Sequence, residues 1–232
     1  MRIAISSDWH GHVPRYNDRE IIKSCDCLVL CGDIFESRIN RDKMERFLTE
    51  LNSLGKRIVM TPGNHDWGIF NAEVMNVSNA LYGSISKDYL KRTFGIDCLI
   101  DEMIYVNGVK IYGTPWTPLF CDWAFMLDEE GLSRKYSNIP EDVEILIAHG
   151  PPFDENSKID SCCPNLYTGQ PDHLGSHAFR DAIIEKKPKY MFCGHIHSGD
   201  HSGVKIGETS CFNVSYLGED YNPHYPIHVL EI

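Results

Sequence analysis

The 232-residue sequence predicts an α/β domain built on mixed β-sheets. Short runs of β-branched and apolar residues alternate with segments whose apolar residues recur at helical spacing, which is the pattern of strands joined by helices. An Asn107-Gly108 pair between two such runs supplies the positive φ angles of a type I′ turn and therefore adds an antiparallel hairpin. No internal repeat or linker-like stretch divides the sequence, so residues 1–232 are expected to form a single domain.

The first part of the chain predicts three strands joined by two helices. Cys27–Cys31 reads CLVLC, a continuous apolar run that is typical of a strand buried on both faces. In Arg41–Leu54 the apolar residues recur at helical spacing, and Gly55 can end the helix. The other elements expected here are the strands Arg2–Ser7 and Arg57–Met60 and the short helix Asp18–Ser24.

The second half of the chain predicts more strands than helices. The hairpin lies around Tyr105–Ile111, and a helix over Ala178–Lys187 has to end before Pro188. Further strands are expected at Glu144–Ala148 and Tyr190–Cys193, and two or three antiparallel strands over Lys205–Ile232.

Three segments rich in Pro, Gly, Trp and Tyr fit neither pattern and are expected to be long surface loops. They are Gly68–Tyr89, Thr114–Pro140 and Pro151–His177. Loops held on a rigid scaffold are where binding residues concentrate, so these segments are expected to surround a site.

The composition excludes several classes of function. Lys and Arg number 22 against 33 Asp and Glu, a net charge of −11, which argues against stable nucleic-acid binding through phosphate contacts. No apolar run approaches the roughly 18–20 residues of a membrane span, so no membrane association is expected. The start of the chain does not resemble a signal peptide, and the nine cysteines lack the spacing of a disulfide scaffold. We therefore expect a cytoplasmic protein with reduced cysteines.

Polar residues follow five of the predicted strands at the point where each strand ends. In open α/β sheets, ligands bind beyond the carboxyl ends of the strands, so these residues are expected to converge on one site. The five motifs are Asp8-Trp9-His10, Gly32-Asp33-Ile34-Phe35-Glu36, Gly63-Asn64-His65-Asp66, His149-Gly150-Pro151-Pro152 and Gly194-His195-Ile196-His197. Each motif alone is weak, because a single histidine is commonly a satisfied core or surface residue. All five together, each after a strand, are hard to obtain by chance.

The candidate ligands in these motifs are carboxylates, imidazoles and one amide, with no thiolate. This donor set suits manganese, iron, zinc or nickel better than a cysteine-type zinc site or an all-oxygen calcium site. Seven candidates are too many for one ion and fit two divalent ions that share a bridging carboxylate. They are Asp8, His10, Asp33, Asn64, His149, His195 and His197.

This ordered set resembles the signature of the calcineurin-like metallophosphoesterase superfamily, which runs Asp-x-His, Gly-Asp-x-x-Asp/Glu, Gly-Asn-His-Asp/Glu, His-x-Pro-Pro or similar, and Gly-His-x-His. The resemblance spans Asp8 to His197. It implies a four-layer sandwich, in which two mixed β-sheets pack together with helices on their outer faces. It also implies two divalent ions, with manganese favoured. One would be held by Asp8, His10, Asp33 and His197, and the other by Asp33, Asn64, His149 and His195, with Asp33 as the bridge.

A second set of motifs is similar to a narrower branch, the brain 239-type metallophosphoesterase-domain proteins. These motifs are Ile111-Tyr112-Gly113-Thr114-Pro115-Trp116-Thr117-Pro118, Trp123-Ala124-Phe125, Ile147-Ala148-His149-Gly150-Pro151-Pro152 and His173-Leu174-Gly175-Ser176. This likeness implies cyclic-nucleotide or related phosphodiester substrates and affinity for purine mononucleotides.

The residues also indicate a mechanism, in which a metal-bridging hydroxide attacks phosphorus. Two divalent ions, two aspartates and one hydroxide sum to about +1, which suits a phosphate ester anion. His65 cannot easily join Asn64 as a ligand, because neighbouring side chains diverge. His65 is better placed as an electrostatic stabiliser or as the general acid that assists the leaving oxygen, the role that the resemblance to the superfamily implies for this position. Glu36 is favoured over Asp66 as the carboxylate that orients His65.

Four residues are candidates for contact with the substrate. Asn64 and His65 belong to the predicted centre, whereas Trp9 and Trp116 could stack on a base or fill the core. Core filling is favoured for Trp9, because it lies between two ligands, and stacking is favoured for Trp116.

We therefore predict a metal-dependent phosphoric ester hydrolase that acts on a small, nucleotide-like phosphodiester or phosphomonoester, with the diester favoured. A protein phosphatase is less favoured. That branch carries Arg after its second acid and before Gly-Asn-His, where this chain has Ser37 and Pro62, although Arg38 lies one residue from the first position. The alternative outside enzymes is a non-catalytic metal-binding scaffold or interaction protein on the same fold.

Overall fold

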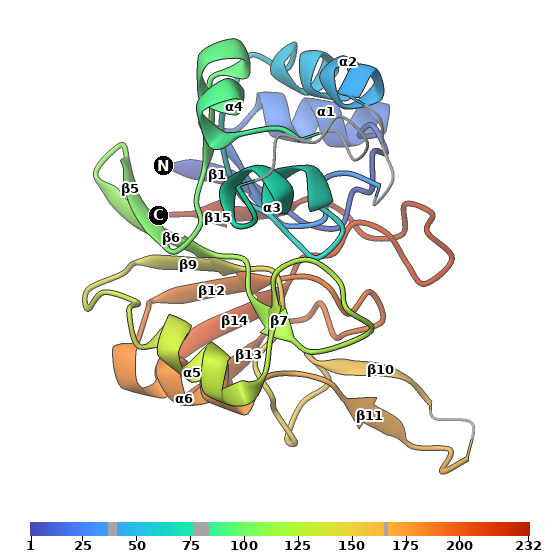
Figure 1. The fold of residues 1–232 in the computed structure, drawn as a ribbon, viewed down its shortest axis with the longest axis vertical. Helices are drawn as coiled ribbons and strands as arrows, with labels where there is room; N and C mark the ends of the chain where they lie inside the picture. Colours follow the sequence, from blue (N-terminus) through green and yellow to red (C-terminus); the bar gives the residue numbers. More distant parts are fainter. Residues whose placement is uncertain (37–40, 77–83, 165–166) are drawn as a thin grey trace.

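A computed structural model of the chain places two mixed β-sheets face to face, with helices on both outer sides (Figure 1). It describes residues 1–36, 41–76, 84–164 and 167–232. The first sheet contains, in spatial order, β15 (His228–Glu231), β1 (Arg2–Ser6), β2 (Cys27–Cys31), β3 (Arg57–Thr61) and β4 (Ile96–Cys98). The second contains β13 (Val204–Ile206), β14 (Thr209–Asn213), β12 (Tyr190–Cys193), β9 (Ile145–Ala148), β6 (Val109–Thr114) and β5 (Glu102–Val106). This arrangement confirms the predicted fold class.

Helices cover the outer side of each sheet (Figure 1). The helices on the side of the first sheet are α1 (Tyr16–Lys23), α2 (Arg41–Asn52) and α4 (Lys87–Phe94), and those on the side of the second are α5 (Glu129–Tyr136) and α6 (His177–Lys186). A further helix, α3 (Trp67–Glu73), follows β3. In the part of the chain that is described, no helix has the length and apolar character needed to cross a membrane.

Alternate residues of the central strands serve two hydrophobic cores. In β2, Cys27, Val29 and Cys31 belong to the core between the sheets. Leu28 and Leu30 belong to the larger core that also contains helix residues. All five side chains are buried, which explains why the strand reads as a continuous apolar run. Burial of each large apolar side chain stabilises the fold by roughly 1.5–3 kcal/mol, so the cores hold the strand ends in fixed positions.

The carboxyl ends of the central strands meet at one edge of the molecule. Strands β1, β2 and β3 are parallel to one another, and β9 is parallel to β12. The two sheets are joined at this edge by hydrogen bonds of Ser7. Its N–H donates to the Val214 carbonyl, and its carbonyl accepts from the Tyr216 N–H, both at 2.9 Å. The loops that leave both sheets are therefore brought together.

Most predicted elements of regular structure lie within two residues of the observed ones. The Asn107-Gly108 turn has φ angles of 49° and 87°, as a type I′ turn requires. In the C-terminal region, β13 pairs antiparallel to β14 and β15 pairs antiparallel to β1, which confirms the predicted antiparallel strands. Strand β14 also pairs in parallel with β12, because it lies between β13 and β12 in the second sheet, and the chain then returns to the first sheet to form β15.

The three predicted loops contain more regular structure than expected. They hold α3, the start of α4, α5, the short pair β7 (Thr117–Pro118) and β8 (Met126–Leu127), and the hairpin of β10 (Ser161–Pro164) and β11 (Pro171–His173). Helix α5 begins after Asp128, whose carboxylate accepts the Gly131 N–H at 2.8 Å, and buries Leu132 and Tyr136. Eight residues with an internal glycine carry too few apolar positions to show helical periodicity in the sequence.

Candidate metal centre

The predicted ligands lie on loops whose backbone is held in unusual conformations. Asp8, Asp33 and His195 have φ angles of 56°, 52° and 68°, and His10 has 43°. Residues other than glycine rarely adopt this left-handed region, and each costs about 1–3 kcal/mol, so the surroundings must enforce it. Backbone hydrogen bonds between loops do so, since His10 N–H donates to the Asp33 carbonyl and Asp8 N–H to the Gly32 carbonyl. Such strain is typical of functional sites.

Asp33 lies at the middle of the cluster. Its Oδ2 atom is 3.3 Å from His149 Nε2, 3.7 Å from His10 Nε2 and 4.0 Å from His65 Nε2. The Asp33 side chain is almost fully buried, and its other oxygen, Oδ1, accepts the His65 backbone N–H at 2.7 Å. One carboxylate oxygen is thus surrounded by imidazole nitrogens from three loops, which is the position that a bridging ligand requires.

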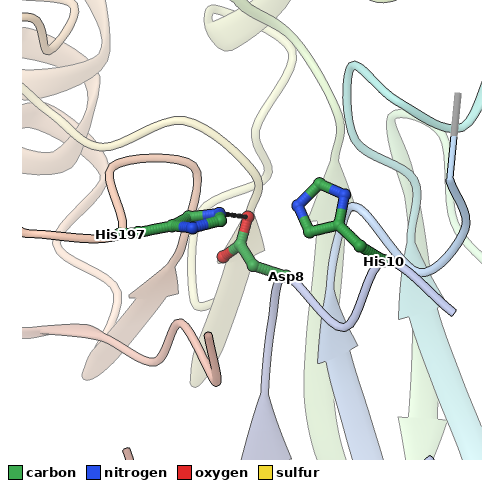
Figure 2. A group of neighbouring side chains, drawn as sticks. All are labelled: Asp8, His10 and His197. Carbon is green, nitrogen blue, oxygen red and sulfur yellow. Dashed lines mark ion pairs between the residues drawn. The ribbon is translucent and has the colours of Figure 1, made fainter. Parts of the chain in front are cut away.

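Asp8 forms the second part of the cluster, between His10 and His197 (Figure 2). Its Oδ1 atom is 3.4 Å from His197 Nε2. The His195 N–H is 3.1 Å from both carboxylate oxygens of Asp8. Potential ligand atoms of Asp8, His10 and His197 all lie within 4.8 Å of one another, as do those of Asp8, Asp33 and His149. These two groups share Asp8, and a third group of His10, Asp33 and His65 overlaps both of them.

Two of the histidines are oriented by carbonyl oxygens behind them. His149 Nδ1 is 3.0 Å from the Cys31 carbonyl, and His197 Nδ1 is 3.1 Å from the Gly218 carbonyl. A carbonyl only accepts, so Nδ1 carries the proton and donates it, which leaves Nε2 of each ring facing a carboxylate. His149 Nε2 also lies 2.8 Å from Asn64 Oδ1. Histidines that bind metals are commonly fixed in this way by a hydrogen bond on the far nitrogen.

The residues fit a pair of divalent ions. His10 Nε2 is buried and has no hydrogen-bond partner, which is costly unless something else accepts its lone pair or proton. The atom points toward Asp33 and neighbours the Asp8 and His197 group. Carboxylate and imidazole donors at this density match a site for Mn, Fe, Zn or Ni.

The charges of the cluster are strongly coupled. Burial alone would raise the pKa of Asp33 and Asp8, but His149 and His197 respectively hold both values well below the usual range. Burial would lower the pKa of His149, yet the charge and hydrogen bond of Asp33 raise it to about 9. In the same way, Asp8 raises the pKa of His197 to about 9 against the effect of burial. Without metal, two imidazolium groups neutralise the two carboxylates.

Metal binding is expected to release protons. A metal ion needs the neutral form of His149 and His197, and both are protonated at pH 7 when their pKa is about 9. The apparent metal affinity should therefore rise with pH over the range 6–9, with up to about two protons released per chain. Calorimetric titration with Mn²⁺ in buffers of different ionisation enthalpy measures this number. No dependence on the buffer would contradict the assignment of these two ligands.

Two glycines of the motifs lie where no side chain fits. A Cβ atom at Gly194 would overlap the Asp8 carboxylate and the Ser7 side chain, and one at Gly63 would overlap Asp33. The loops therefore approach the carboxylates closely enough that only glycine is accommodated.

Asp66 joins two of the ligand loops. Its buried carboxylate accepts the N–H groups of Gly63 at 2.7 Å, Phe35 at 2.9 Å and Ile34 at 3.3 Å. Burial and the charge of Asp33 raise the pKa of Asp66 to about 7, although the backbone N–H groups oppose this rise. Asp66 thus ties the loop after β2 to the loop after β3.

Glu36 lies at the surface, away from the centre. Its side chain is exposed and lines a shallow groove with Val13, Lys43 and Arg46, whereas His65 lines the cleft over the metal ligands. The preference for Glu36 over Asp66 as the carboxylate that orients His65 is therefore not supported by geometry. Ser37 and Arg38 lie outside the described residues.

Substitution of these two acids should separate their roles. Asp66→Ala leaves three buried N–H groups without their acceptor, so the free energy of unfolding of the metal-free protein should fall by about 3 kcal/mol. Glu36→Gln removes an exposed charge and should change neither unfolding nor turnover beyond about twofold. Urea unfolding and steady-state kinetics on both variants measure these effects. A tenfold loss of turnover in Glu36→Gln with unchanged metal content would restore Glu36 as the orienting group.

The two tryptophans proposed to contact substrate lie in the core. Trp9 is fully buried against Phe47 and Tyr216, and its Nε1 donates to Ser6 Oγ at 2.8 Å. This agrees with the favoured interpretation of Trp9 as core filling. The prediction of stacking by Trp116 is wrong, because Trp116 is buried and its Nε1 donates to the Asp101 carboxylate.

A cleft of about 520 Å³ opens over the ligands and is bordered by residues that the sequence did not identify. Trp123 stacks on the His65 ring, with ring centres 4.5 Å apart and an angle of 18° between planes. The Tyr221 ring lies next to the rings of His10 and His197, with ring centres 4.9 and 5.2 Å apart. The sequence offers only the motif Trp123-Ala124-Phe125 as a signal for Trp123, and it offers no motif around Tyr221.

Comparison with known proteins agrees with this geometry. The sequence model of the family described as calcineurin-like phosphoesterase matches residues 1–199. Human metallophosphoesterase domain-containing protein 1 is 28% identical over 220 residues, which cover 89% of this chain and 64% of the human protein. The mouse protein of the same name gives the same values. The chain thus spans somewhat less than two thirds of the length of these relatives.

Solved structures share the fold at low sequence identity. TT1561 of Thermus thermophilus superposes with a TM-score of 0.64 at 12% identity, covering 91% of this chain and 88% of that protein. Phosphopantetheinyl hydrolase from Mycobacterium tuberculosis gives 0.53 at 14% identity, with coverage of 94% and 90%. At this level of sequence identity, these matches show a shared fold.

Proposed function

Because the chain belongs to the calcineurin-like phosphoesterase family, we propose that it hydrolyses small phosphate esters with the help of two divalent metal ions. The observation that carries this proposal is the position of Asp33, whose Oδ2 lies within 4.0 Å of imidazole nitrogens from three loops. One ion would be held by Asp8, His10, Asp33 and His197, and the other by Asp33, Asn64, His149 and His195. Manganese is the favoured metal.

The chemistry that two bound ions supply is Lewis acidity and a water of lowered pKa. The chain supplies the geometry around them. Asp8 and Asp33 provide two negative charges, so a +4 metal pair leaves the centre positive on a chain of net charge −11. The carbonyls of Cys31 and Gly218 keep His149 and His197 in the tautomer that presents Nε2. The net positive centre would attract the phosphoryl oxygens, while these residues fix where the ions would lie.

His65 is proposed to deliver a proton to the leaving oxygen. Its ring borders the cleft, its Nε2 is 4.0 Å from Asp33 Oδ2, and Trp123 covers one face of the ring. The backbone N–H of His65 is fixed on Asp33, so the side chain is held next to the ligands without being one of them. We assign the orientation of His65 to its stacking on Trp123 and to the loop that Asp66 fastens.

The proposed substrate is a small phosphodiester or phosphomonoester that is nucleotide-like, with the diester favoured. A cytoplasmic location and the absence of stable nucleic-acid binding remain predictions from cysteine spacing and charge. A panel of phosphomonoesters, phosphodiesters and cyclic nucleotides, supplied to the chain with Mn²⁺, tests the function. Turnover of at least one class is the expected result. Metal-loaded protein that turns over none of them would favour the non-catalytic scaffold.

A further inference from the structure

The wall of the cleft beyond the metal ligands is apolar. Among the described residues, twelve large hydrophobic side chains are exposed, and four of them line this one cleft: Leu119, Phe120, Leu174 and Tyr221. Leu119 and Phe120 are 62% and 64% exposed. Single exposed apolar residues are ordinary, but their concentration around one cleft marks a binding surface.

Two aromatic residues of the cleft, Trp123 and Tyr221, lie on loops that are hydrogen-bonded to the metal-ligand loops. The Trp123 loop is fastened by the Ala124 N–H, which donates to the Asn64 carbonyl at 3.3 Å, and by the buried Phe125. The Tyr221 loop is fastened at Gly218, whose carbonyl accepts from His197 Nδ1. Trp123 and Tyr221 are therefore held beside the position where a phosphoryl group would lie. Rigid aromatic walls favour a flat apolar group next to that position.

Apart from the proposed metal ligands and His65, the one charged side chain in the described lining of the cleft is acidic. This lining, as far as the described residues go, contains no arginine or lysine, and Glu219 is its one acidic side chain apart from the proposed ligands. Glu219 Oε1 accepts the Ser198 N–H at 3.0 Å, next to His197. A second negative charge on the substrate would meet Glu219 without a lysine or arginine in the described lining to compensate it.

We propose that the substrate is a monoanionic phosphodiester with one planar, apolar ester group, which lies against Phe120 and Trp123 while the phosphate faces the metal ligands. This inference rests on the proposed phosphoesterase function and narrows its substrate class. Glu219 and the lack of lysine and arginine in the described lining select against dianionic monoesters and polyphosphates. The apolar wall selects the substituent that is not cleaved.

Three synthetic esters with the same leaving group test this selection. Phenyl p-nitrophenyl phosphate, methyl p-nitrophenyl phosphate and p-nitrophenyl phosphate all release p-nitrophenolate, so the difference lies in the remaining substituent. With Mn²⁺-loaded protein, kcat/KM should be about tenfold higher for the phenyl than for the methyl diester. Both diesters should exceed the monoester. Equal values for phenyl and methyl, or preference for the monoester, would overturn the inference.

Variants identify the residues that carry the selection. Phe120→Ala should bring the ratio of phenyl to methyl kcat/KM close to one, mainly through KM of the phenyl diester. The control Tyr105→Ala removes an aromatic side chain that is 56% exposed on strand β5 and should leave the ratio unchanged. A ratio that both variants leave at the wild-type value would show that the wall does not select the substituent.

Glu219→Gln tests the electrostatic part, since glutamine keeps an oxygen that can accept the Ser198 N–H. Because Glu219 is exposed and screened, kcat/KM for the monoester should rise roughly threefold, with little change for the methyl diester. An equal change for both would contradict a charge effect. Failure of metal-loaded protein to cleave any of the three esters would instead count against the proposed function, so the two claims fail separately.

Discussion

Asp33→Asn is expected to abolish metal binding and phosphoesterase activity together. Oδ2 of Asp33 lies within 4.0 Å of nitrogens of His10, His65 and His149, and the carboxylate is one of the two that would balance the charge of the ions. Substituting residues that merely support a metal ligand costs about 10–100-fold in affinity, so loss of a bridging ligand should cost more than 100-fold. Metal content by atomic emission and turnover of a diester measure both effects.

Asn at position 33 should preserve the backbone conformation of the loop, so a loss of metal or activity can be attributed to the lost carboxylate charge. Asn tolerates the left-handed φ of 52° at this position, and its Oδ1 can still accept the His65 N–H. Asp181→Asn is a matched control, because Asp181 is exposed on helix α6. It should keep both metal and turnover. An Asp33→Asn protein that retained two ions, or turned over normally without them, would contradict the assignment of Asp33 as the bridge.

His65→Ala should keep the metal ions and lose turnover by about 10²–10⁴-fold on esters with poor leaving groups. The ring is not required as a ligand in the proposed centre, and alanine preserves the backbone hydrogen bond to Asp33. The loss should shrink for p-nitrophenolate, which leaves without protonation. Kinetics on a series of leaving groups of rising pKa, with metal content measured in parallel, check this expectation.

The matched control is His177→Ala, since His177 is exposed at the start of α6. It should retain wild-type kinetics across the series. Full activity of His65→Ala on poor leaving groups would rule out its role as general acid. Loss of metal in His65→Ala would instead make it a ligand.

Elements of the fold could be predicted where a short run of residues carries a local signal, such as a continuous apolar run or a turn dipeptide. The run Cys27–Cys31 and the Asn107-Gly108 turn are local signals, and each corresponds to an observed element. Helix α5 and the parallel pairing of β14 were missed for different reasons. The helix is short and is held by its cap and two buried large side chains, and the pairing of β14 depends on its place between β13 and β12 in the second sheet. Neither leaves a periodic pattern in the sequence.

The candidate ligands could be predicted because each stands directly after a strand, and parallel strands present their ends at one edge. The structure brings these residues together around Asp33 and Asp8. The surroundings of the centre could not be predicted in the same way. Trp116 and Trp123 belong to one loop region of similar composition, yet one is buried on Asp101 and the other stacks on His65. That difference arises from tertiary packing.

The proposed metal centre accounts for part of the high histidine content and is compatible with the acidity of the chain. Of 11 histidines, four are proposed as ligands and one as the proton donor. The net charge of −11 disfavours a polyanion at the surface but is compatible with a locally positive centre made by metal ions.

Stepwise addition of Mn²⁺ to the metal-free chain tests the account most directly, when bound metal and hydrolysis of phenyl p-nitrophenyl phosphate are followed together. Turnover is predicted to appear with metal and to reach its maximum at about two ions per chain. Complete occupancy without turnover, or full turnover in the presence of a chelator that keeps the chain metal-free, would contradict a metal-dependent phosphoesterase.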